Sequence, residues 1–236
     1  MVGISLYTIV HCLIRPFRPI NVYYAAQRLS VVSKFLGIDV EVRIPESVKG
    51  KGPFVFIGNH QNSYDLFTVT HAVQPLTVSI GKKSLKWIPF FGQMYWLTGN
   101  ILIDRENSSK AMNTIGTAAK KIKEKGISVW LFPEGTRSYG RGVQKFKTGA
   151  FRTALQAQVP MVPVCISNTH ELIKLNRWNN GKVIIELLEP IDLQAENHEH
   201  VRTLADNVRE KMTQKISELS IEAGTELPKY QPKVKS

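Results

Sequence analysis

Seven short runs that are apolar or that alternate apolar with polar residues recur between residues 38 and 188, and segments with helical periodicity separate several of them. Runs of this length are typical of strands in a sheet whose faces are covered. Strands that alternate with helices predict an α/β fold, here a single domain with a mixed, largely parallel sheet flanked by helices. The expected strands are Ile38–Arg43, Phe54–Ile57, Leu76–Ile80, Asn100–Ile103, Ile127–Phe132, Val159–Ile166 and Lys182–Leu188.

The first 37 residues have a different character and predict two helices ahead of this domain. Residues 1–14 carry no formal charge, but as a helix they would span about 21 Å, less than the roughly 30 Å of a hydrocarbon core. Residues 1–38 contain four basic residues and no acidic one. We therefore expect 1–37 to be a membrane-associating element that lies in an anionic membrane surface. The alternatives are a helical hairpin packed on the core and a single spanning helix.

The remaining boundaries follow from composition. We expect the main domain to run from residue 38 to 224 and residues 225–236 to form a loose C-terminal tail. Cys12 and Cys165 are far apart in apolar surroundings, which predicts buried thiols and neither a disulfide nor a metal site. The His198-Glu199-His200 cluster lies in a polar setting without further spaced ligands, which favours a solvated loop.

The formal charge of +12 favours an anionic partner, which could be nucleic acid, a membrane surface or a phosphorylated substrate. Residues 81–152 hold fourteen Lys and Arg against four Asp and Glu, so most of the excess lies in the middle of the chain. A basic nucleic-acid-binding arm would place this excess positive charge at one end of the chain. The distribution therefore favours an anion-binding pocket, although a nucleic-acid surface remains an alternative.

A histidine and an aspartate follow the expected strand Phe54–Ile57. His60 and Asp65 have the residue types of a general base and the carboxylate that orients it. Ser63 is a candidate N-cap for a helix over Leu66–Val73. Two residues five apart on one helix would point about 140° away from each other, so His60 must lie in the preceding loop for Asp65 to reach it. A purely structural histidine is the alternative.

The segment Phe132–Ser138 follows another expected strand and combines a glycine with a carboxylate and a guanidinium group. Gly135 permits a close approach of the backbone, and Arg137 carries a planar fork suited to a phosphate. Glu134 is expected to steer Arg137 or a substrate hydroxyl, or to form a structural ion pair. Further cations that could complete an anion pocket are Arg105, Lys82 and Lys83.

Several common catalytic motifs do not occur in the sequence. It contains no Gly-x-Ser-x-Gly elbow, no His-Glu-x-x-His and no P-loop. Without a protein nucleophile, the attacking hydroxyl is expected to belong to the substrate. The oxyanion donors are then sought among the backbone N–H groups at the helix start after His60.

Four ordered blocks resemble the motifs of the glycerolipid acyltransferases. The first is the His-x4-Asp block within Asn59–Asp65, and the second runs from Gly81 to Arg105 with Ile-Pro-Phe-Phe-Gly at its centre. Phe132–Ser138 reads Phe-Pro-Glu-Gly-Thr-Arg-Ser, and Val159–Val164 is rich in Val and Pro. Within that family the chain is similar to bacterial enzymes that acylate lysophosphatidate.

The resemblance implies a glycerol-3-phosphate acyltransferase-like fold and transfer of an acyl group from acyl-CoA or acyl carrier protein to the sn-2 hydroxyl of lysophosphatidate, giving phosphatidate. It implies no cofactor, no metal and no nucleic-acid partner. It also implies a position on the cytoplasmic face of the inner membrane, as a monotopic or peripheral protein. The implied catalytic residues are His60 and Asp65, and the implied substrate-binding residues are Glu134, Gly135, Thr136, Arg137, Arg105 and Lys82.

Two other functions remain open. One is an acyltransferase of the same fold with another acceptor, such as glycerol-3-phosphate or a lysophospholipid with a head group. The other is a basic binding protein for membranes or nucleic acid without catalytic activity. The apolar residues between Trp87 and Leu102 are expected either to line an acyl channel or to pack in the core.

Overall fold

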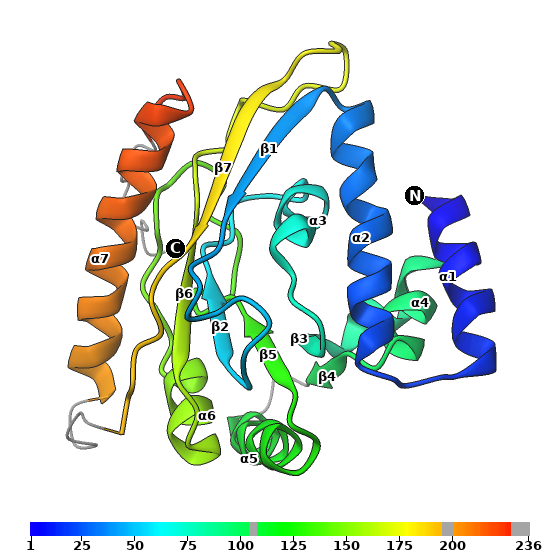
Figure 1. Ribbon diagram of the computed structural model, residues 1–236, viewed down its shortest axis with the longest axis vertical. Coiled ribbons are helices and arrows are strands. Elements are labelled where there is room, and N and C mark those ends of the chain that lie inside the picture. Colours follow the sequence, from blue (N-terminus) through cyan, green and yellow to red (C-terminus); the bar gives the residue numbers. More distant parts are fainter. Residues whose placement is uncertain (104–107, 195–200, 228–236) are drawn as a thin grey trace.

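The computed structural model describes residues 1–103, 108–194 and 201–227 (Figure 1). Within these ranges, seven strands form one sheet in the order β1-β7-β6-β2-β5-β3-β4. All neighbouring pairs are parallel except β6 and β7, which are antiparallel. The prediction of a mixed, largely parallel sheet is therefore confirmed. The strands are β1 (Ile38–Arg43), β2 (Val55–Gly58), β3 (Thr77–Lys82), β4 (Ile101–Ile103), β5 (Ser128–Leu131), β6 (Met161–Ile166) and β7 (Gly181–Leu187).

Helices cover both faces of the sheet, as Figure 1 shows for α7 (Val201–Glu222) on one side and α2 (Ile20–Phe35) and α3 (Asp65–Thr68) on the other. The central strand β2 is buried on both faces. Val55 and Ile57 belong to the hydrophobic cluster that includes residues of α5, α6 and α7, whereas Phe56 belongs to the opposite cluster. The two-residue period of a strand sends alternate side chains to opposite faces. These helices are α5 (Ser108–Lys125), α6 (Gly149–Ala157) and α7 (Val201–Glu222).

The two predicted N-terminal helices are present as α1 (Val2–Ile14) and α2 (Ile20–Phe35). Helix α1 has an unusual polarity, because its buried residues are Ser5, Thr8 and Cys12. Its apolar residues point outward, and those that are exposed are Val2, Leu6, Tyr7, Val10, Leu13 and Ile14. Among the helices in the described part of the chain, none is long and apolar enough to span a bilayer.

The segment after His60 differs from the single helix expected over Leu66–Val73. It forms a short helix α3 (Asp65–Thr68) followed by a 3₁₀ turn η1 (Val69–Ala72). The expected N-cap role of Ser63 is wrong, because Tyr64 precedes the helix and its N–H donates to Asn62 Oδ1 at 2.8 Å.

The 3₁₀ turn η1 is fastened to α2 by a histidine. His71 Nε2 lies 2.8 Å from Ser33 Oγ and 3.1 Å from the Ser30 carbonyl oxygen. Burial lowers the pKa of His71, which favours its neutral form. Helix α2 is therefore bonded to η1, which directly follows the helix that carries Asp65.

The second sequence block folds into two short helical segments and an edge strand. These are η2 (Lys83–Trp87), α4 (Phe91–Leu97) and β4. Phe17, in the turn between α1 and α2, donates its N–H to the Leu97 carbonyl at 2.8 Å, and its ring packs edge-on against Trp96. Block two thus lies against the N-terminal helix pair.

Candidate active site

The carboxyl ends of β2, β5 and β3 lie at one edge of the sheet, because these strands are adjacent and parallel. In open α/β sheets, ligands bind beyond such strand ends. His60 follows β2 by two residues, and Glu134 follows β5 by three. The sheet order therefore brings the loops of two sequence blocks to one place, although β3 and β4 lie between them in the sequence.

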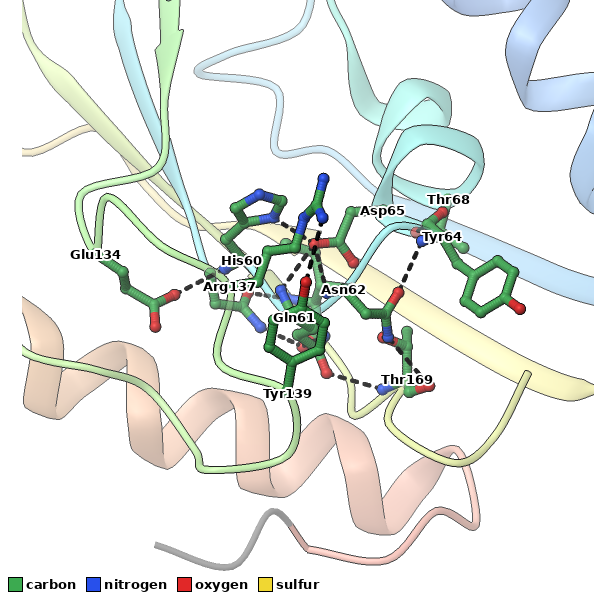
Figure 2. A network of polar contacts seen from close by, with 12 residues as sticks. His60, Gln61, Asn62, Tyr64, Asp65, Thr68, Glu134, Arg137, Tyr139 and Thr169 are labelled. Atoms are coloured by element: carbon green, nitrogen blue, oxygen red, sulfur yellow. Dashed lines mark hydrogen bonds and ion pairs between the residues drawn. The ribbon is translucent and has the colours of Figure 1, made fainter. Parts of the chain in front are cut away.

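His60 and Asp65 form a direct pair, with His60 Nδ1 2.6 Å from Asp65 Oδ2 (Figure 2). A carboxylate accepts hydrogen bonds, so Nδ1 carries the hydrogen and Nε2 is left with a free electron pair to take a proton. The His60 side chain is 22% exposed, whereas that of Asp65 is 5% exposed. His60 lies in the loop before α3, as the helix geometry required.

The same carboxylate oxygen also organises the loop. Asp65 Oδ2 accepts the N–H groups of Gln61 at 2.7 Å and Asn62 at 3.2 Å. With the Tyr64 N–H bonded to Asn62, three amides between His60 and α3 are already engaged. The backbone N–H groups at the helix start after His60 were the expected oxyanion donors, and these three N–H groups form the loop's own hydrogen bonds instead.

The loop that carries His60 is anchored to the end of β6 by two buried amide side chains. Asn59 bonds both backbone groups of Ile166, donating to its carbonyl at 3.0 Å and accepting its N–H at 2.9 Å. Gln61 donates to the Ser167 carbonyl at 2.8 Å and accepts the Thr169 N–H at 2.8 Å. These bonds fix the backbone on both sides of the histidine.

The Phe132–Ser138 block is joined to this loop through backbone hydrogen bonds. The Ser138 N–H donates to the His60 carbonyl at 2.8 Å, and the Tyr139 N–H donates to the Gln61 carbonyl at 2.9 Å. In Figure 2 the side chains of His60 and Arg137 extend in the same direction from these two loops. The two predicted motifs therefore belong to one site.

Glu134 is buried and contacts the protein backbone. Its Oε1 accepts the His60 N–H at 2.7 Å, and its Oε2 accepts the Gln144 N–H at 2.8 Å. Burial raises the pKa of Glu134 to about 7, while the two N–H donors act in the opposite direction. The sequence led us to expect a partner for Arg137 or a substrate hydroxyl, whereas the structure places this carboxylate behind His60.

The residues after Glu134 form a cationic turn. Gly135 has a φ of +70°, and a Cβ at this position would lie 2.9 Å from Lys147 Nζ. Thr136 is exposed at the tip of the turn, and Arg137 donates from Nη1 to the Tyr139 hydroxyl at 3.2 Å. Lys147 thus adds a second cation beside Gly135. Sequence reasoning missed it, although it lies in a Lys- and Arg-rich stretch that follows the third block.

The other predicted cations belong to the second sequence block. Lys82 is exposed at the end of β3, which β5 separates from β2, and it lies at the same edge of the sheet. It pairs in register with Ile103 at the end of β4. Arg105, which follows two residues later, lies outside the described residues, as does the His198–His200 cluster.

Phe132 is a further residue of the site that the sequence did not single out. Its ring stacks on the His60 imidazole with a centroid distance of 4.1 Å and an interplanar angle of 16°. Its position directly before Pro133 in the third block was the available signal. The ring covers one face of the imidazole, so that Phe132, Asp65 and Glu134 restrict His60 from three directions.

This arrangement has the parts needed to deprotonate a substrate hydroxyl next to an anion. It provides a partly exposed imidazole with an oriented ring, and cations one loop away. Arg137 and Lys147 suit a phosphate or another anionic group on the substrate that carries the hydroxyl.

Known proteins resemble this chain over much of its length. The model of the family described as Acyltransferase matches residues 39–167. A 1-acyl-sn-glycerol-3-phosphate acyltransferase of Escherichia coli is 49% identical over 213 residues, covering 90% of this chain and 87% of that protein. The enzyme of that name from Saccharomyces cerevisiae is 35% identical over 193 residues, covering 80% of this chain and 63% of the yeast protein.

A similar fold has been solved. The crystal structure of the 1-acyl-sn-glycerophosphate acyltransferase from Thermotoga maritima matches with a TM-score of 0.66 and 24% sequence identity. The match covers 89% of this chain and 88% of the other. At 24% sequence identity, this match shows a shared fold and nothing further.

Proposed function

The chain belongs to the acyltransferase family, and we propose that His60 and Asp65 perform its acyl transfer by general-base catalysis. The chain acylates 1-acyl-sn-glycerol-3-phosphate and thereby forms phosphatidate. The observation that carries the catalytic assignment is the 2.6 Å contact between His60 Nδ1 and Asp65 Oδ2 beside a cationic turn.

In the proposed step, the sn-2 hydroxyl of the acceptor attacks the carbonyl carbon of an acyl thioester. His60 Nε2 takes the hydroxyl proton as the new C–O bond forms. Asp65 stays ionised and stabilises the imidazolium. The C–S bond then breaks, and the leaving thiolate receives the proton from His60. The acyl group passes directly to the acceptor, and no acyl-enzyme forms.

The acceptor phosphate is proposed to bind at the turn after Glu134. Arg137 supplies a bidentate guanidinium group, and Lys147 supplies a second positive charge beside Gly135. Gly135 and Thr136 bring backbone close to the phosphate. Lys82 and Arg105 are proposed as further cations that attract the phosphate.

Glu134 is proposed to act through His60 and not by touching the substrate. Its carboxylate accepts the His60 N–H and so links the phosphate-binding turn to the base. Movement of the turn would then move the histidine with it.

We propose acyl-CoA or acyl carrier protein as the thioester donor, since both supply the thiol leaving group that this step needs. The proposed step uses no cofactor and no metal. The exposed apolar side chains of Trp87, Ile88 and Phe90 are placed to meet acyl chains or lipid, since they do not pack in the core.

The acceptor is a lipid, and we propose that the chain reaches it from an anionic membrane surface, as a monotopic or peripheral protein on the cytoplasmic face of the inner membrane. The outward apolar side of α1 supports this, because an amphipathic helix of this polarity is stable when that side is covered by lipid. The charge of +12 favours anionic lipids.

The decisive assay supplies purified protein with each thioester donor and a panel of acceptors, and measures thiol release. We expect release with lysophosphatidate and much less with glycerol-3-phosphate or with lysophospholipids that carry a head group. Comparable release with glycerol-3-phosphate would point to the alternative acceptor. If no acceptor gave thiol release, the alternative of a binding protein without catalytic activity would be favoured.

His60→Ala is the matched inactive control. We expect turnover to fall by at least about a thousandfold, since the base and its oriented proton transfer are both lost. The fold, followed by circular dichroism, and vesicle binding should be unchanged. Near-normal turnover in this variant would overturn the general-base assignment.

A further inference from the structure

A second exposed apolar surface lies at the opposite end of α2 from the Phe17–Trp96 contact. Trp178 is 86% exposed, Leu175 73% and Phe35 71%. Two of these side chains come from the loop before β7, which passes beside the end of α2 (Figure 1). We name Lys34, Phe35, Lys174, Leu175 and Trp178 the tip surface. An indole ring exposed to this extent is uncommon unless a partner covers it.

The loop of the tip surface is held in one conformation by a buried asparagine. Asn180 Oδ1 accepts the Lys174 N–H at 2.7 Å and Arg177 Nε–H at 2.8 Å. Its Nδ2 donates to the carbonyls of Leu36 at 2.6 Å and Lys174 at 3.0 Å. The exposed side chains are therefore presented by an ordered loop, which lowers the entropy lost on docking.

The loop is also fitted closely to the end of α2. Asn180 N–H donates to the Gly37 carbonyl at 2.7 Å, and a Cβ on Gly37 would lie 1.6 Å from the Trp178 carbonyl oxygen. Trp178 and Phe35 thus belong to one rigid surface that spans two segments 143 residues apart in the sequence.

The charges of the tip surface are all positive. Lys34 and Lys174 are exposed, and residues 172–180 contain no acidic residue. The surface also continues an exposed stripe along α2 that contains Tyr24, Val31 and Phe35, which recur at the spacing of one helix face. Apolar, aromatic and basic groups in this combination are suited to the boundary between lipid headgroups and acyl chains.

We propose that the tip surface docks on an anionic lipid bilayer, with the Trp178 indole at the headgroup boundary and the two lysines on lipid phosphates. This rests on the membrane association proposed above and adds a second contact to it. With lipid contacts at both ends of α2, the helix would be held at a defined tilt. The same tilt would apply to η1, to which α2 is bonded through His71, and to α3, which directly precedes η1.

The test places an environment-sensitive fluorophore on the tip. Asn176→Cys puts a single reactive thiol in the exposed loop, because native Cys12 and Cys165 are both buried. Vesicles contain phosphatidylglycerol and phosphatidylcholine. We expect a blue shift and at least about a twofold rise in emission on binding, as the label leaves water. Ile221→Cys on α7, also an exposed site, is the matched control and should not respond.

A double substitution measures the energetic contribution. Leu175→Ser with Trp178→Ser should weaken partition onto these vesicles by at least about tenfold, as the buried apolar area is lost. Ile221→Ser should leave partition unchanged. Acyl transfer to acceptor dispersed in detergent should be equal in all three proteins.

The possible failures are distinguishable. A silent label at position 176 on protein that still cosediments with vesicles would overturn the tip contact alone. If the unsubstituted protein does not bind vesicles, the proposed membrane association itself fails. A response to an acidic carrier protein in place of vesicles would make the tip a protein-docking surface and overturn the lipid assignment.

Discussion

At the scale of single residues, the site is defined by what restrains His60. Asp65 fixes the ring through Nδ1, Phe132 stacks on its face, and Glu134 holds its backbone N–H. Glu134 is the residue whose role depends most on the structure. On the surface of the turn the same carboxylate could contact a substrate, but here it is buried and accepts the backbone N–H of His60, which supports the proposed positioning role.

Substitution of Glu134 by Gln separates these two roles. Both Glu134 oxygens accept backbone N–H groups, whereas Gln has one oxygen, so one buried N–H loses its acceptor at a cost of about 1–3 kcal/mol. We expect kcat to fall about tenfold or more, with KM for the acceptor little changed. Arg137→Ala is the contrast and should mainly raise that KM. If Glu134→Gln also acted mainly on KM, a direct substrate contact would be indicated.

The unfolding free energy should depend on pH through the Glu134 carboxyl group. Its pKa rises from 4.5 to about 7 on folding, so folding favours the protonated form. This stabilisation is present below about pH 4.5 and is lost as the pH rises through about 7, a change of about 3 kcal/mol. Urea unfolding at pH 5 and pH 8 should therefore show a larger destabilisation by Glu134→Gln at pH 5. A pH-independent difference would mean that the pKa is not raised.

At the scale of elements, the positions of short helical segments depend on close backbone contacts. The packing of α4 on η2 is an example, because Gly92, the second residue of α4, lies directly against η2. A Cβ at Gly92 would lie 2.2 Å from the Leu85 carbonyl oxygen and 2.5 Å from that of Lys86. Neither atom can rotate away, so the second sequence block needs a glycine here for steric reasons.

Gly92→Ala should therefore displace α4 from η2. We expect a loss of about 2–4 kcal/mol in unfolding free energy and a fall in Tm of about 5–10 °C. Gly116→Ala in α5 is the matched control, since a Cβ added there would have no neighbouring atom within 4 Å outside its own helix backbone. That change should be neutral or stabilising by up to about 1 kcal/mol. Equal thermal stability of the two variants would refute the packing explanation.

At the scale of the whole molecule, charge and apolar surface are unevenly distributed. The described exposed apolar residues concentrate on α1, α2, η2 and the loop before β7, and Figure 1 shows α7 on the other side of the sheet. Electrostatic attraction to anionic lipid acts over roughly 10 Å at moderate salt, whereas apolar insertion requires contact. Salt should therefore weaken the electrostatic contribution to vesicle binding, and substitution of exposed apolar residues should weaken the apolar contribution.

Val10→Ser with Leu13→Ser removes two outward side chains of α1. We expect partition onto phosphatidylglycerol vesicles to weaken by at least about tenfold. Partition of the unsubstituted protein should also fall as salt is raised from about 0.1 M to 1 M, since the Debye length shortens to about 3 Å. Cosedimentation measures both effects, with Ile221→Ser as the control. Unchanged partition in the double variant would exclude α1 from the lipid contact.

Much of the fold and part of the site could be predicted from local patterns. The seven runs predict the seven described strands within about two residues at most boundaries, and the spacing of His60 and Asp65 requires a loop histidine. These features depend on residues close in sequence. The prediction of Ser63 as N-cap was wrong, because Asp65 accepts the Gln61 N–H and Asn62 accepts the Tyr64 N–H. The sequence does not show which of several polar side chains in a loop will accept these N–H groups.

The sequence by itself determined an α/β sheet and a loop histidine paired with an aspartate, and it predicted a separate anion-binding motif. Only the tertiary structure decided that these motifs form one site, because β5 pairs with β2 across two intervening strands of the sequence. It also decided that Glu134 bonds a backbone N–H 74 residues away and that α1 buries its polar side. Strand order and burial arise from packing of the whole chain, so no local pattern contains them.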